Sequence, residues 1–162
     1  MKALVRLGGR KLGTLVRLPA FTLLWLLPAW VGMGVAAAAV SLLPFSRLAR
    51  LFGRNIGPVA LMPLAGEEQL RRARQIRTTV ALVARHAIGR SDCVPQALLA
   101  VAMCRIHGVP AAVHFGLAKV KARGPEGDLD AHAWVVCGPV AIAGGTSFGE
   151  FTPVSCFVSG LE

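Results

Sequence analysis

Hydrophobic side chains recur at helical spacing in two consecutive segments of this chain. In residues 67–87 the apolar positions stand three or four residues apart, which predicts a helix with one buried face that ends before Gly89. A second helix is predicted from Cys93 to about residue 106, with Ser91 or Asp92 as its N-cap. The middle of the chain is therefore expected to form two helices in succession.

Beyond the second helix the pattern changes to the alternation that is typical of strands. Residues 111–120 and 131–137 predict two strands, separated by a polar loop at 121–130. A turn at Gly138 and Pro139 then leads to a short third strand at 140–143. Two helices followed by an antiparallel meander indicate an α+β fold.

The N-terminal part of the chain is apolar and basic. Residues 18–46 contain no charged side chain, and this run exceeds the roughly 20 residues that a helix needs to span a bilayer. Pro19, Pro28 and Pro44 interrupt the run, so a helix or hairpin packed on the domain, a membrane-associated segment and a secretory signal all fit the pattern. A turn-rich basic connector at 47–66 follows. We therefore expect an N-terminal helical region at 1–66 and a catalytic domain at 67–162.

Charge is distributed unevenly between these two regions. Residues 1–66 carry eight basic and no acidic side chains, whereas residues 67–162 carry ten basic and eight acidic ones, so only +2 of the net +10 belongs to the second region. Such an excess suits an anionic membrane, an acidic partner or nucleic acid. The chain has no tyrosine and no aromatic side chains interleaved with basic ones, so nucleic-acid binding is not expected.

The four cysteines form neither a metal-binding pattern nor a regular disulfide framework. None of Cys93, Cys104, Cys137 and Cys156 belongs to a C-x-x-C pair. Reduced thiols in a cytoplasmic protein, with no metal and no cofactor, are the simpler interpretation.

Cys93 is a candidate nucleophile because it stands at the predicted start of a helix. Unpaired backbone N–H groups there stabilise a thiolate and also an oxyanion formed on a substrate carbonyl. His132 follows 39 positions later on a predicted strand, with its side chain on the same side as Trp134. Taken singly, a buried inert cysteine explains Cys93 equally well, and a histidine among apolar residues is more often a structural core side chain than a catalytic one. Their order is that of nucleophile and base in Cys–His hydrolases.

Four segments carry a resemblance to a known family. They are residues 91–98 (SDCVPQAL), 107–111 (HGVPA), 115–117 (FGL) and 131–135 (AHAWV). Together they resemble the lasso-peptide biosynthesis B proteins, which belong to the transglutaminase-like superfamily, and residues 17–19 and 42–50 resemble the helical N-terminal region of that family. The resemblance implies a transglutaminase/papain-like core, in which a cysteine-bearing helix packs on a small antiparallel sheet.

The resemblance also implies the site residues. Cys93 and His132 match the catalytic cysteine and histidine of that family. The family's third residue, an aspartate about twelve positions after the histidine, has no counterpart, because residues 143–146 read AGGT. Glu150 is the nearest downstream acid and is our candidate for this role, while Asp128 and Asp130 lie upstream in the loop.

By resemblance, the protein is a cysteine peptidase that removes the leader peptide from a ribosomally made lasso-peptide precursor. It is expected to act with a separate leader-recognition protein and an asparagine-synthetase-like cyclase, in the cytoplasm or on the membrane through residues 18–46. Acyl transfer to an amine, and a catalytically silent scaffold that binds leader or cyclase, remain open alternatives.

Overall fold

The computed structural model describes residues 19–87, 92–119, 129–145 and 149–159, which form four helices and one antiparallel sheet of five strands. The helices are α2 (Ala20–Leu42), α3 (Phe45–Phe52), α4 (Glu67–His86) and α5 (Cys93–Ile106). The strands are β1 (Arg54–Gly57), β2 (Ala111–Lys119), β3 (Leu129–Cys137), β4 (Val140–Ala143) and β5 (Thr152–Ser159), in the spatial order β1-β5-β2-β3-β4. The α+β class expected from the sequence is confirmed.

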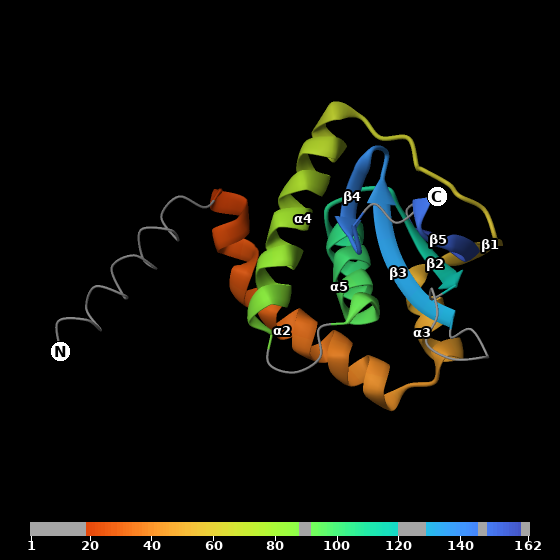
Figure 1. The fold of residues 1–162 in the computed structure, drawn as a ribbon. Coiled ribbons are helices and arrows are strands. Elements are labelled where there is room, and N and C mark those ends of the chain that lie inside the picture. Colours follow the sequence, from red (N-terminus) through yellow and green to blue (C-terminus); the bar gives the residue numbers. More distant parts are fainter. Residues whose placement is uncertain (1–18, 88–91, 120–128, 146–148, 160–162) are drawn as a thin grey trace.

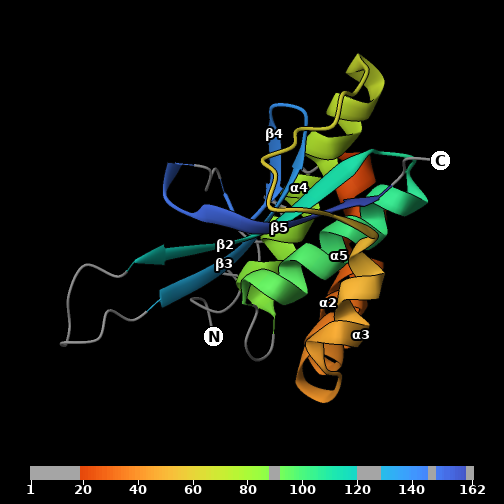
Figure 2. The same cartoon turned by 90° about the vertical axis from the view of Figure 1, so that its right-hand side faces the viewer.

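The described elements are stacked in layers. Helices α4 and α5 cover one face of the sheet, α5 against β3 and α4 against β4 (Figure 1). Helix α2 crosses the outer side of both helices and does not take a place on the sheet (Figure 2). The main hydrophobic core lies between the helices and the near face of the sheet.

The helical spacing read from the sequence gives α4 and α5 nearly residue by residue. In α4 the buried apolar side chains are Ala73, Ile76, Val80 and Val83, so one stripe of the helix faces the core. Helix α5 begins at Cys93, with Asp92 in the N-cap position although its side chain makes no capping hydrogen bond. Strand β4 has its predicted bounds, and the turn before it lies at Gly138 and Pro139.

The connector predicted at 47–66 is more structured than its turn-forming residues suggested. It contains most of α3, whose Leu48 and Phe52 are buried, and all of β1. Strand β1 pairs with β5, so the N-terminal region predicted at 1–66 supplies an edge strand to the sheet. Strand β5, which the sequence did not predict, pairs with both β1 and β2.

The second face of the sheet carries a smaller core. Trp134 and Val136 of β3 pack there with Ala112, Cys156 and Val158, and Leu61 and Phe151 cover them from the flanking segments. Because successive residues of a strand point to opposite faces, Ala133 and Val135 belong to the helix-covered core and Trp134 to this second one.

Candidate active site

Cys93 is the first residue of α5, as predicted. It is half-buried and packs at the margin of the helix-covered core. The first backbone N–H groups of a helix have no acceptor within the helix, so they are available to an anion beside the Cys93 thiol. Helix α5 is 14 residues long, and its apolar body anchors this end against β3.

The other three cysteines are buried and unreactive by environment. All four thiols are unpaired, and Cys104, Cys137 and Cys156 are each inaccessible to solvent. Burial raises the pKa of Cys104 to about 12, with a smaller effect from Cys137, and burial also raises the pKa of Cys137 and Cys156. Cys93 is therefore the one cysteine that is positioned to act as a nucleophile.

His132 lies on β3 on the same face as Trp134, as the alternation predicted. Its ring is stacked on Trp134 with centroids 6.2 Å apart and an interplanar angle of 15°, and Phe151 lies 4.9 Å away. Trp134 in turn stacks on His114 of β2 at 5.3 Å. The rings of Trp134 and Phe151 thus limit the orientations open to the His132 imidazole, and its plane lies within 15° of that of Trp134.

The buried end of this stack is uncharged. His114 is inaccessible to solvent, and its Nε2 accepts a hydrogen bond from the Leu61 N–H at 3.2 Å. Burial lowers the pKa of His114 to about 4, so the ring is neutral at neutral pH. Trp134 therefore stacks on an uncharged imidazole on one side. His132, on its other side, is half-buried and is the member of the stack nearer to solvent.

A main-chain carbonyl fixes the tautomer of His132. Its Nε2 lies 2.8 Å from the Gly144 carbonyl oxygen. A carbonyl only accepts hydrogen bonds, so Nε2 carries the proton and Nδ1 of the neutral ring keeps a lone pair. This is the tautomer that a general base acting through Nδ1 requires. The carbonyl belongs to residue 144, twelve positions after the histidine, where the resemblance described in the sequence analysis led us to expect an aspartate.

Gly144 holds this carbonyl in place because no other residue fits there. Its φ of +75° lies in the left-handed region, and a Cβ would come within 2.4 Å of the Ala133 oxygen and 2.7 Å of the Trp134 Cα. The sequence analysis did not identify this interaction. The pair of glycines at 144 and 145, in place of the expected acid, was the available signal.

The described contacts of Cys93 and His132 do not include each other. Among the described residues no hydrogen bond joins the two side chains, and their neighbours differ: Cys93 packs with the helix-covered core, and His132 lies beside Trp134 and Phe151 on the second face of the sheet. The catalytic pairing of the two residues stays a prediction.

The candidate acids do not hold the histidine either. Glu150 is exposed, and within the described part of the chain it has no hydrogen bond or ion pair with His132, whose Nε2 is taken by Gly144. The role of Glu150 as third residue stays a prediction that the observed hydrogen bond does not require. Asp130 is exposed at the start of β3, and Asp128 lies outside the described residues.

Comparison with models of known protein families identifies the family of this chain. The sequence model of the transglutaminase-like superfamily matches residues 39–156, more than half of the chain. The chain belongs to the transglutaminase-like superfamily. Searches of curated proteins and of solved structures found no match.

Membership of the transglutaminase-like superfamily confirms the coarse part of the sequence interpretation. Members are typically Cys–His enzymes, so the family indicates a cysteine-dependent hydrolase or acyltransferase. The match begins at residue 39 and ends at residue 156, so it includes α3 and β1, the helices α4 and α5, the strands β2 to β4 and the first part of β5.

Proposed function

We propose that this transglutaminase-like protein is a cysteine peptidase that removes the leader from a lasso-peptide precursor. The main support is the hydrogen bond from His132 Nε2 to the Gly144 carbonyl, which leaves Nδ1 as the basic nitrogen. The family match and the AHAWV and SDCVPQAL segments supply the rest of the support.

In the proposed reaction His132 Nδ1 accepts the thiol proton of Cys93, and the thiolate attacks the carbonyl carbon of the scissile amide. The tetrahedral oxyanion is held by N–H groups at the start of α5. Collapse of the intermediate breaks the C–N bond, and the imidazolium gives its proton to the leaving amine. Water then attacks the thioester, with His132 as base, and releases the carboxylate and the thiol.

This chemistry requires Cys93 Sγ and His132 Nδ1 to approach each other when the precursor binds. A neutral carbonyl also stabilises the imidazolium less than a carboxylate does, so proton transfer to His132 is expected to be less favourable than in an enzyme with an aspartate at residue 144. The proposed partners are the precursor, a separate leader-recognition protein and an asparagine-synthetase-like cyclase. The proposed location is the cytoplasm or its membrane face.

The missing aspartate supports a second candidate function. A chain that retains the fold but has a glycine at residue 144, where the resemblance implies an aspartate, suits a silent scaffold that binds leader or cyclase. A scaffold would need neither side chain for its effect on the pathway.

One reconstitution separates these two functions. Precursor, recognition protein and the full chain are incubated, and leader release is followed by mass spectrometry for the wild type, Cys93→Ala, Cys93→Ser and His132→Ala. A peptidase loses release in all three variants, by about a thousandfold or more. Undiminished release by Cys93→Ala rules out the thiol mechanism. Glu150→Gln tests the candidate third residue: a loss of turnover would support that role, and undiminished turnover would dismiss it.

A further inference from the structure

The outer side of α2 is an apolar surface that no other described residue of the chain covers. Six of its exposed apolar side chains follow one stripe along the helix at intervals of three and four residues, namely Leu24, Leu27, Val31, Val35, Ala38 and Leu42. Leu24, Leu27 and Leu42 are 74%, 71% and 81% exposed. From the first to the last of these residues the stripe extends over about 27 Å, at 1.5 Å per residue. Most folded proteins cover so long a hydrocarbon surface.

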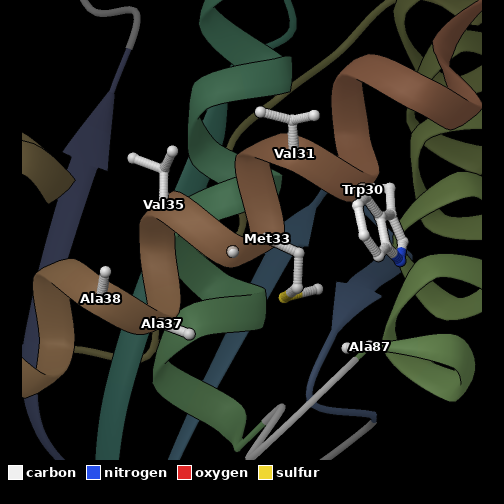
Figure 3. A pocket seen from close by; sticks show the side chains of 8 residues that line it. Trp30, Val31, Met33, Val35, Ala37, Ala38 and Ala87 are labelled. Carbon is white, nitrogen blue, oxygen red and sulfur yellow. The ribbon is translucent and has the colours of Figure 1, made fainter.

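The opposite side of α2 is fixed to the domain. Met33 and Ala36 are buried there against the core, and Thr22 is buried beside Thr79 of α4. Figure 3 shows the two sides: Val31 and Val35 project from one side of the helix, and Met33 points the other way. Helix α2 is therefore apolar on both sides. The domain covers one side, and the stripe on the other side is exposed.

The polar groups of α2 are turned away from the stripe or satisfied within the helix. The Trp30 Nε1–H donates to the His86 carbonyl of α4, at 3.5 Å, and the Ser41 hydroxyl donates to the Ala37 carbonyl at 3.0 Å. The stripe therefore offers aliphatic carbon without a side-chain hydrogen-bonding group. A protein interface normally adds a polar rim with matched hydrogen bonds, whereas hydrocarbon tails need none.

The basic residues near the stripe favour an anionic membrane as the surface that binds it. Arg47 and Arg50 are exposed on α3, directly after the end of α2, beside the exposed ring of Phe45. No acidic residue occurs anywhere in residues 1–66, and five further basic residues precede α2 in the sequence. Arginine next to exposed aromatic and aliphatic side chains is typical of segments that lie on an anionic bilayer.

We propose that the protein docks on an anionic membrane surface through the stripe of α2, with the helix lying in the plane of the interface. Helix α2 is one described helix that is long and apolar enough to cross a bilayer, at 23 residues. Crossing is opposed by its packing, because Arg72 of α4 lies 4.9 Å over the Phe21 ring and would enter the hydrocarbon with it. In-plane docking keeps α4 on the aqueous side.

A hollow beside the stripe is also suited to the acyl chains of a membrane. Its volume is about 410 Å³, and Trp30, Gly34, Ala37, Ala38 and Ala87 are among the residues that line it. Its lining is mostly hydrocarbon, and flexible acyl chains fill an irregular hollow without the shape matching that a folded partner needs. The docking proposal does not depend on the proposed peptidase activity.

Vesicle co-sedimentation of the full chain tests the proposal. The protein is expected to bind vesicles of phosphatidylcholine with phosphatidylglycerol and to bind pure phosphatidylcholine at least tenfold more weakly. Leu24→Glu and Leu27→Glu are each expected to weaken binding by about tenfold or more. Leu64→Glu is the matched control, since Leu64 is 96% exposed but lies outside the stripe, and it should bind as the wild type does.

Three results would overturn the proposal. They are failure of the wild type to sediment with anionic vesicles, equal binding by the Leu27 and Leu64 variants, and retention in cell membranes after alkaline carbonate extraction. The last result would mean that α2 spans the bilayer.

Because Leu24 and Leu27 are mostly exposed, their variants should keep the wild-type circular dichroism spectrum and unfolding midpoint. The double variant Arg47→Gln/Arg50→Gln, which leaves the stripe intact, should reduce binding about tenfold or more at low salt, and unchanged binding would count against the electrostatic contribution.

Discussion

Replacing Gly144 by alanine separates the two constraints that hold the His132 hydrogen bond. The first constraint is conformational: a φ of +75° costs an alanine about 1–2 kcal/mol. The second is steric, because the new Cβ would lie 2.4 Å from the Ala133 oxygen and 2.7 Å from Trp134. Relief of such contacts against backbone atoms costs roughly 1–3 kcal/mol more. We expect Gly144→Ala to lose about 2–5 kcal/mol of unfolding free energy.

The neighbouring glycine is a matched control. Gly145 has a similar φ of +71°, but no atom of the described residues lies within 4 Å of the position its Cβ would take. Gly145→Ala should therefore lose only the conformational part, about 1–2 kcal/mol. Urea unfolding followed by circular dichroism gives both values by linear extrapolation.

The same pair of variants tests the tautomer of His132. To relieve the contacts the chain must move residue 144, and its carbonyl then leaves His132 Nε2. Nitrogen-15 NMR of the imidazole should show a protonated Nε2 in the wild type and in Gly145→Ala, and a mixture of tautomers in Gly144→Ala. Equal stability of the two variants, together with an unchanged His132 spectrum, would refute the assignment of the Gly144 carbonyl as the orienting group.

Three further outcomes are expected. Native protein treated briefly with iodoacetamide should gain one adduct, at Cys93, because the other three thiols are buried and have a raised pKa. Denatured protein should gain four adducts. Labelling of native Cys93→Ala would contradict this prediction. Because the folded pKa of His114 is about 4, below its ordinary value of 6.5, unfolding takes up a proton as the pH falls. Stability should therefore be intact above pH 6.5 and decline towards pH 4 by up to about 3 kcal/mol, whereas His114→Gln should show a flatter profile in urea titrations at several pH values. Gly116→Ala should lower stability by about 1–3 kcal/mol and shift tryptophan fluorescence, because its Cβ would lie 2.7 Å from the Trp134 ring; an unshifted spectrum would mean that Trp134 is not held there.

Patterns in the nearby sequence predicted the helices and the strand β3. Helix α4 has a helical spacing of buried residues, α5 is buried on most sides but begins and ends close to its predicted bounds, and the alternation along β3 puts His132 and Trp134 on one face. Strand β5 was missed because its position depends on pairing with β2 across a separation of 48 residues, Ala111 with Ser159. Pro153 near its start, at the register shift, also weakens its pattern. Helix α3 is only eight residues long and stood among turn-forming residues.

In the candidate site, too, some features were predictable from the nearby sequence and others were not. The positions of Cys93 at a helix start and of His132 on a strand follow from the nearby sequence. The partner of the histidine could not be predicted, because every residue has a carbonyl, and only the backbone path through Gly144 decides which one reaches the ring. A search restricted to side chains therefore led to Glu150.

The order of the strands has a consequence for synthesis on the ribosome. Strand β5 lies between β1 and β2, yet it is made after both of them. Until β5 emerges, β1 lacks its partner and one edge of β2 has open N–H and C=O groups, which are prone to pair with other chains. Nascent chains that stall before residue 152 are therefore expected to need a chaperone, and late truncation should cause aggregation rather than release of a smaller folded protein.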